Sequence, residues 1–92
     1  GKTLQALAVT LTRATEGPTL IIAPTSVCMN WLSEAQRFAP TLNPIQFGSG
    51  DRQKLLDQLQ PFDMVVCSYG LLQQEEVAEM LANVQWQTII LD

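Results

Sequence analysis

The sequence predicts an α/β fold: a three-layer arrangement in which a parallel β-sheet forms the middle layer and helices cover both faces. Three observations favour this arrangement. Short apolar runs of the kind that form buried strands alternate with longer segments whose apolar residues recur at helical spacing. Strands separated by helices connect through right-handed crossovers, which produce parallel pairing. The length of 92 residues suits one small domain.

Four segments have the pattern of helices. The first runs from Thr3 to about Arg13, where apolar residues recur three and four positions apart, and Gly17-Pro18 ends it. The second runs from about Val27 to Phe38, with Ser26 as a candidate cap and Pro40 beyond its end. The others are a short helix from Asp51 to about Leu59 and an acidic amphipathic helix from Leu71 to Leu81.

Four further segments have the pattern of strands. The runs Thr19–Ala23 and Asp63–Cys67 are apolar on both faces, as central strands of a parallel sheet require. Pro44–Phe47 is a short candidate that leads into a loop at residues 48–50. Thr88–Asp92 is the last strand, and it ends on an acidic residue. Ligands of such sheets gather at the carboxyl ends of the strands, so the polar residues found there are the candidate site.

Composition and charge exclude several classes of protein. A net charge of −4 argues against DNA binding by bulk electrostatics alone, although backbone N–H groups and hydroxyls can still contact DNA. Cys28 and Cys67 lie far apart and no histidine is present, so we expect no zinc site and two buried, reduced thiols. No apolar stretch approaches the roughly 20 residues that cross a bilayer, so no membrane partner is expected.

The tripeptide Gly1-Lys2-Thr3 is the first candidate site. It lies at the start of the first predicted helix, where free N–H groups and the helix dipole attract anions. In a phosphate-binding loop, Lys2 reaches the β- and γ-phosphates of ATP, and the hydroxyl of Thr3 binds Mg²⁺. The tripeptide is short, and an alternative interpretation makes Lys2 a solvated residue and Thr3 a helix cap.

Asp92 is the second candidate. It follows three aliphatic residues at the end of a predicted strand, a position from which a carboxylate can hold Mg²⁺ opposite the hydroxyl of Thr3. Strands often end in aspartate, so this pattern alone is weak. The combination of Gly1-Lys2-Thr3 with Asp92, with strands and helices of the right type between them, favours a nucleotide site that takes ATP and Mg²⁺.

Further patterns fill the chain between these two motifs. They are Leu20 to Ser26, Asn30-Trp31, Glu34 and Arg37 to Pro40, then Asp63 to Leu72, then Trp86 to Asp92. Together they resemble the first lobe of Swi/Snf-type helicase-like ATPases, a branch of helicase superfamily two. In that family a strand ending in Pro-Thr or Pro-Ser leads into a helix with Asn-Trp, Glu and Arg-Phe or Lys-Phe. The resemblance covers essentially the whole chain, with the motifs in the family's order.

The resemblance implies an incomplete RecA-like P-loop lobe, with residues 1–92 running from the end of the phosphate loop to the magnesium-binding aspartate. It implies an ATP-driven motor that moves along double-stranded DNA and remodels protein–DNA complexes. The ATP phosphates would bind Gly1, Lys2 and Thr3, and Mg²⁺ would bind Thr3 and Asp92. The residues in contact with DNA would be Pro24, Thr25, Ser26, Ser68 and Tyr69.

By the same resemblance, the isolated chain is expected to lack ATPase activity. The family's catalytic glutamate directly follows the motif aspartate, and its catalytic arginines come from a second RecA-like lobe of the same protein. Phosphoryl transfer depends on such groups for positioning and for stabilisation of charge. The expected location is the cytoplasm or the nucleoid, or the nucleus in a eukaryote.

Alternative interpretations stay open on the sequence alone. The chain can instead belong to an RNA helicase or a restriction translocase of the same superfamily, or be a non-catalytic α/β interaction module. Thr25, Ser26 and Ser68 also suit capping of helices and turns. Trp31 and Phe38 are predicted to pack in the core rather than to stack on bases. The acidic residues predicted to form a solvated helix face are Glu75, Glu76 and Glu79.

Overall fold

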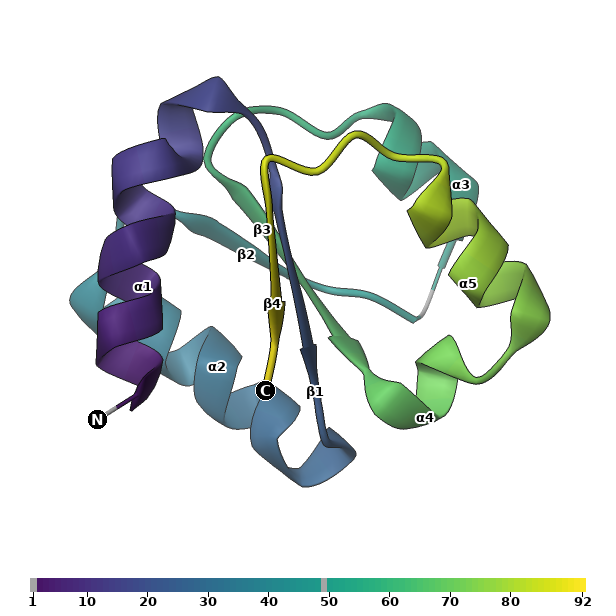
Figure 1. Ribbon diagram of the computed structural model, residues 1–92, viewed down its shortest axis with the longest axis horizontal. Coiled ribbons are helices and arrows are strands. Elements are labelled where there is room, and N and C mark those ends of the chain that lie inside the picture. Colours follow the sequence, from purple (N-terminus) through teal and green to yellow (C-terminus); the bar gives the residue numbers. More distant parts are fainter. Residues whose placement is uncertain (1, 49) are drawn as a thin grey trace.

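The computed structural model describes residues 2–48 and 50–92. Its centre is one sheet of four strands in the order β2-β3-β1-β4, in which every neighbouring pair is parallel. Figure 1 shows this sheet with helices on both sides. The predicted three-layer α/β fold is therefore confirmed. The strands are β1 (Thr19–Ala23), β2 (Asn43–Gln46), β3 (Asp63–Ser68) and β4 (Thr88–Leu91).

Helices on each face of the sheet cover a separate hydrophobic cluster. Helices α1 and α2 cover one face, and α3, α4 and α5 cover the other (Figure 1). Across the described ranges, no helix is long and apolar enough to cross a membrane. The helices are α1 (Lys2–Arg13), the 3₁₀ turn η1 (Ala14–Glu16), α2 (Thr25–Phe38), α3 (Arg52–Asp57), α4 (Tyr69–Leu72) and α5 (Glu75–Ala82).

Strand β1 explains why the sheet needs both helical layers. All five of its residues are buried, and successive side chains of a strand point to opposite faces. Ile21 and Ala23 pack in the α1–α2 cluster, whereas Leu20 and Ile22 pack in the cluster beneath α3, α4 and α5. Burial of each large aliphatic side chain contributes about 1.5–3 kcal/mol relative to exposure. The central position of β1, between β3 and β4, follows from this burial on both faces.

Helix α2 begins two residues before its predicted start at Val27. The carbonyl of Pro24 accepts the N–H of Val27 at 2.8 Å and that of Cys28 at 3.2 Å, so Thr25 and Ser26 form the first turn. Pro24 has the extended backbone angles φ −57° and ψ 147° that suit the residue before a helix, and no side chain caps α2. The interpretation of Ser26 as a helix cap is therefore wrong.

The single helix predicted from Leu71 to Leu81 is in fact two helices. The first, α4, is one turn that starts earlier, at Tyr69, because the hydroxyl of Ser68 accepts the N–H of Leu71 at 3.1 Å. The chain then bends at residues 73–74 before α5 begins. Apolar residues on both sides of the bend pack in the same hydrophobic cluster. Their helical spacing therefore continues across the bend, and the sequence pattern does not reveal where the helix is interrupted.

The two aromatic residues of α2 have different surroundings. Trp31 is 2% exposed and packs in the α1–α2 cluster, as predicted. Phe38 is 47% exposed at the end of the helix, where the guanidinium of Arg37 lies 5.0 Å from the centroid of its ring. The prediction that Phe38 is a core residue is wrong, because the buried stripe of α2 continues through Ala35 and Ala39 instead.

Two smaller predictions are confirmed. Cys28 and Cys67 are free thiols, and both are buried. Burial raises the pKa of Cys67 to about 11, so its thiol stays protonated at neutral pH. The acidic side chains of α5 are exposed to solvent, at Glu75, Glu76 and Glu79.

Candidate functional site

The carboxyl ends of β1, β3 and β4 lie side by side at one rim of the sheet. In the register of the strands, Ala23 is the partner of Ser68, and Ile22 is the partner of Leu91. Figure 1 shows that α1 begins at the same end of the molecule as the start of α2 and the C-terminus. The fold therefore brings the described candidate residues to one end of the sheet.

Lys2 and Thr3 form the first turn of α1, while Gly1 lies outside the described residues. Lys2 is exposed and Thr3 is half-buried. The first turn contains no acidic residue, although the positive end of the helix dipole favours acids there and disfavours cations. Arg13, in the last turn, lies at the end that favours a cation. The charge of Lys2 would be stabilised by a bound anion rather than by its own helix.

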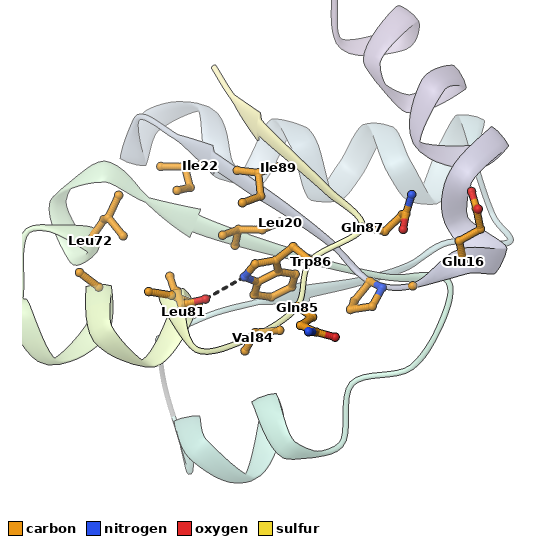
Figure 2. A pocket seen from close by; sticks show the side chains of 14 residues that line it. Glu16, Leu20, Ile22, Leu72, Leu81, Val84, Gln85, Trp86, Gln87 and Ile89 are labelled. Atoms are coloured by element: carbon orange, nitrogen blue, oxygen red, sulfur yellow. Dashed lines mark hydrogen bonds between the residues drawn. The ribbon is translucent and has the colours of Figure 1, made fainter.

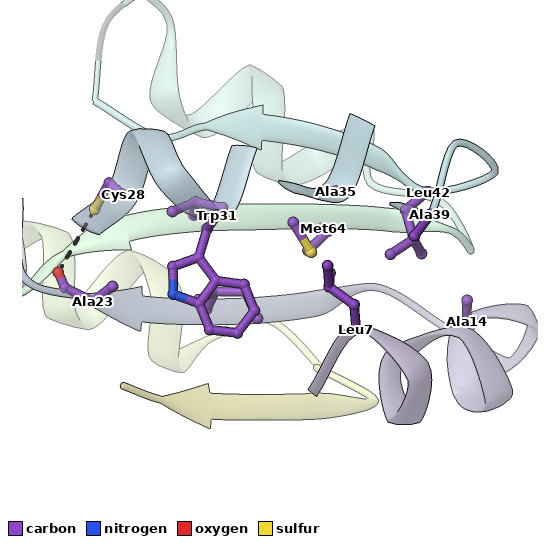
Figure 3. Packing of buried hydrophobic residues seen from close by; sticks show 11 residues of the cluster. Leu7, Ala14, Ala23, Cys28, Trp31, Ala35, Ala39, Leu42 and Met64 are labelled. Atoms are coloured by element: carbon purple, nitrogen blue, oxygen red, sulfur yellow. Dashed lines mark hydrogen bonds between the residues drawn. The ribbon is translucent and has the colours of Figure 1, made fainter. Parts of the chain in front are cut away.

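Asp92 is held by hydrogen bonds to two different elements. Its backbone N–H donates to the carbonyl of Ile22 at 2.8 Å, which extends the pairing of β1 and β4 by one residue. Its Oδ2 accepts the indole N–H of Trp31, with Nε1 at 2.8 Å. Figure 3 shows the ring of Trp31 between α2 and the sheet, within the α1–α2 cluster. Main chain and side chain together fix the carboxylate just beyond the end of β4.

The bond between Trp31 and Asp92 was not predicted from the sequence. A buried tryptophan usually donates its N–H, so the sequence gives a reason to look for an acceptor. It does not identify that acceptor, because 61 positions separate the two residues. The indole N–H of the other tryptophan, Trp86, donates at 2.9 Å to a backbone carbonyl only five residues away, that of Leu81.

The oxygen donors at this end of the sheet fit a nucleotide-bound Mg²⁺ better than a metal cage made only of protein. Mg²⁺ prefers oxygen ligands and keeps several waters, so at phosphate sites it takes only one or two protein groups. Asp92 is exposed, and among residues 2–48 and 50–92 no side chain is hydrogen-bonded to the second oxygen of its carboxylate. In residues 2–48 and 50–92, no group of three or more acidic, cysteine or histidine residues could hold a metal.

Two turns that carry hydroxyl groups lie beside each other on the rim. Thr25 and Ser26 are exposed in the first turn of α2, and Ser68 precedes α4. A Cβ atom added to Gly70 would lie 3.9 Å from Oγ1 of Thr25 and 4.0 Å from Oγ of Ser68. The two hydroxyls therefore flank a space that the absent side chain of Gly70 leaves open.

The capping roles considered for these hydroxyls divide between the two turns. Ser68 does cap its helix, through Oγ. Thr25 and Ser26 do not, because α2 has no side-chain cap, so backbone N–H groups at its start are available to an outside acceptor. Tyr69, the first residue of α4, is 36% exposed. Exposed hydroxyls and available N–H groups are the donors that proteins use to contact phosphate oxygens.

A groove of about 750 Å³ lies elsewhere, on the face of the sheet that α5 covers. Its lining is largely apolar and includes Leu20, Leu81 and Trp86 (Figure 2). None of the candidate residues for ATP, Mg²⁺ or DNA lines it. The groove is therefore separate from the candidate residues at the rim.

Comparison with known proteins identifies the family. A family profile described as SNF2-related domain matches residues 1–92. The chain is 37% identical to the chromatin-remodeling ATPase INO80 of Schizosaccharomyces pombe and 34% identical to the helicase SWR1 of Eremothecium gossypii. Each alignment covers 100% of this chain, which spans 7% of the length of each relative.

A solved structure gives the same result. The fold matches the Sulfolobus solfataricus SWI2/SNF2 ATPase core in complex with dsDNA, with a TM-score of 0.81 and 36% sequence identity. The match covers 100% of this chain and 19% of that one. The resemblance drawn from the motifs is thereby confirmed over the whole chain. The protein belongs to the SNF2-related domain family.

Proposed function

We propose that this chain forms part of the first RecA-like lobe of an ATP-dependent motor that moves along double-stranded DNA and remodels protein–DNA complexes. The observation that carries the proposal is the rim, where the first turn of α1, Asp92 and the two hydroxyl turns lie at one end of a parallel sheet. The names of the relatives, an ATPase, a helicase and an ATPase core in complex with dsDNA, agree with it. Because the chain spans less than a tenth of those two curated relatives, we assign the activity to a longer protein that contains it.

In this proposal, one end of the rim binds the nucleotide. Lys2 neutralises charge on the β- and γ-phosphates, and Gly1 and the N–H groups at the start of α1 add hydrogen-bond donors. Thr3 and Asp92 hold Mg²⁺, whose charge offsets that of the phosphate oxygens when it is bound.

The other part of the rim binds DNA. Because the chain is acidic, with a net charge of −4, contact with the phosphate backbone depends on local donors rather than on an overall positive charge. Contacts of this kind carry no sequence information, which suits a motor that must pass over any sequence. The residues assigned to it are Pro24, Thr25, Ser26, Ser68 and Tyr69.

Hydrolysis of ATP also needs groups that the residues assigned to ATP, Mg²⁺ and DNA do not supply. Phosphoryl transfer requires a group that positions the attacking water and cations that stabilise the transition state. We assign these groups to the rest of the longer protein, including a second RecA-like lobe that faces this one. We expect the protein to act where the cell's DNA lies, in the cytoplasm and nucleoid of a prokaryote or in the nucleus of a eukaryote.

The test is the ATPase rate of the longer protein without nucleic acid, with duplex DNA and with RNA. We expect duplex DNA to stimulate the rate, and Lys2→Ala to abolish the stimulated rate. Lys54→Ala is the matched control, because Lys54 lies with Asn43 and Asp63 near the opposite ends of the strands. A strict preference for RNA would support an RNA helicase instead. A complete lack of nucleotide binding would support a non-catalytic interaction module.

A further inference from the structure

We propose that Trp31 is a positioning residue of the nucleotide site, whose indole N–H fixes the Asp92 carboxylate in the orientation that holds Mg²⁺. The inference rests on the proposed function, in which Asp92 is a magnesium ligand. It adds to the site a buried residue of α2 that acts on the metal only through Asp92.

The donor of this hydrogen bond is rigid. Trp31 is almost completely buried, in the same cluster as Leu7 of α1 and Met64 of β3, so its ring cannot turn away from the rim (Figure 3). The distance of 2.8 Å from Nε1 to Oδ2 is that of a good hydrogen bond, and the negative charge of the acceptor strengthens it. The indole occupies one oxygen of the carboxylate, and no side chain of the described residues is hydrogen-bonded to the other.

Asp92 has no second support of this kind. Among the described residues, Trp31 provides the one side-chain hydrogen bond to its carboxylate, and Asp92 is otherwise exposed. Without the indole, the backbone bond to Ile22 would hold the main chain, but the side chain would be free to populate several rotamers. Ordering such a side chain when the metal binds costs free energy, so the affinity for Mg²⁺ would fall.

Packing alone does not require this arrangement. Trp86 satisfies its N–H with the backbone carbonyl of Leu81, five residues away on the same side of the sheet. Trp31 instead directs its N–H out of the core to an ionisable group on another element. A phenylalanine could fill much of the same space, so the N–H group is the part of Trp31 that the core does not explain.

The test measures how a fluorescent, non-hydrolysable ATP analogue binds to the longer protein over a range of Mg²⁺ concentrations. We expect Trp31→Phe to raise the Mg²⁺ concentration for half-maximal binding by about tenfold, as is typical when the partner that orients a metal ligand is removed. The ATPase rate should largely recover at saturating Mg²⁺, because the ligands themselves remain. Trp86→Phe removes the same N–H group from the other face of the sheet and should leave this midpoint unchanged.

A second replacement separates the hydrogen bond from packing. The benzothiophene isostere of tryptophan at position 31 keeps the size of the ring and removes only its N–H. It should reproduce the shift in Mg²⁺ dependence without lowering the thermal unfolding temperature. An unshifted midpoint with this isostere, or an equal shift in Trp86→Phe, would overturn the inference while the proposed function stands. Wild-type binding that does not depend on Mg²⁺ would overturn both.

Discussion

Ala23 of β1 and Ser68 of β3 are register partners in the parallel sheet, so the turns that follow these two strands leave the rim side by side. One turn brings the exposed hydroxyl of Thr25, and the other brings the hydroxyl that caps α4. Both hydroxyls border the space beside Gly70. Outside α4, the hydroxyl oxygens are the nearest atoms of the described residues to this space, so it is the position on the rim where we expect a DNA phosphate.

The first prediction concerns Gly70→Ala. The new Cβ would lie 3.9 Å from Oγ1 of Thr25 and 4.0 Å from Oγ of Ser68, which are ordinary contact distances, so the fold should accept it. Alanine also favours a helix over glycine by up to about 1 kcal/mol. The methyl group would nevertheless occupy the space for the phosphate. We expect the longer protein to bind duplex DNA about fivefold more weakly, the loss of roughly one hydrogen bond.

The control for this experiment is Gln73→Ala, which replaces an exposed residue at the other end of α4. DNA affinity, measured by fluorescence anisotropy with a labelled duplex, should be unchanged in that variant. Equal affinities of wild type and Gly70→Ala would show that no phosphate occupies the space beside Gly70.

The second prediction separates capping from binding at the two hydroxyls. Ser68→Ala removes the bond to the N–H of Leu71 and should lower the free energy of unfolding by about 1 kcal/mol. Thr25→Ala removes an exposed group that caps nothing and should change it by less than about 0.5 kcal/mol. Both variants should weaken binding to duplex DNA. Urea denaturation measures the free energy of unfolding. A loss of stability in Thr25→Ala equal to that in Ser68→Ala would contradict the assignment of capping to Ser68 and not to Thr25.

The sheet could be predicted because its strands carry a clear signal. Strands β1 and β3 are apolar on both faces, a pattern that is buried only when helices cover both sides of the sheet. The helix boundaries were less predictable, because they depend on individual hydrogen bonds. The carbonyl of Pro24 starts α2 two residues early, and the hydroxyl of Ser68 starts α4.

The candidate site could likewise be predicted only in part. Its location follows from topology, since the carboxyl ends of parallel strands share one edge and the residues after those strands must lie on it. The bond between Trp31 and Asp92 could not be predicted, because it depends on how α2 packs on the sheet. This packing determines which carboxylate the buried indole N–H of Trp31 faces. The space beside Gly70 likewise depends on two turns that the sequence keeps far apart.

The third prediction is that Cys67 makes stability depend on pH in the alkaline range. Burial, and then the nearby Cys28, raise the pKa of its thiol from 9.0 to about 11 in the folded chain. A group with a higher pKa in the folded state stabilises that state below its unfolded pKa, and this contribution is lost as the pH rises through the folded pKa. The free energy of unfolding should therefore fall between about pH 9 and 11. Urea denaturation across this range should show a shallower fall in Cys67→Ala, and identical slopes would rule out the thiol as a cause.

The fourth prediction is that Lys2→Ala affects nucleotide binding and stability in opposite directions. Lys2 is a cation in the first turn of α1, where the helix dipole disfavours positive charge, so its removal should leave the free energy of unfolding unchanged or raise it by about 0.3–1 kcal/mol. Its removal should weaken binding of an ATP analogue to the longer protein at least about tenfold, because a charge-assisted bond to phosphate contributes about 1.5–3 kcal/mol. Lys54→Ala removes a lysine from the last turn of α3, where the dipole favours it, so it should slightly lower stability and leave nucleotide binding unchanged. Nucleotide affinity that is unaffected by Lys2→Ala would mean that Lys2 is only a solvated residue.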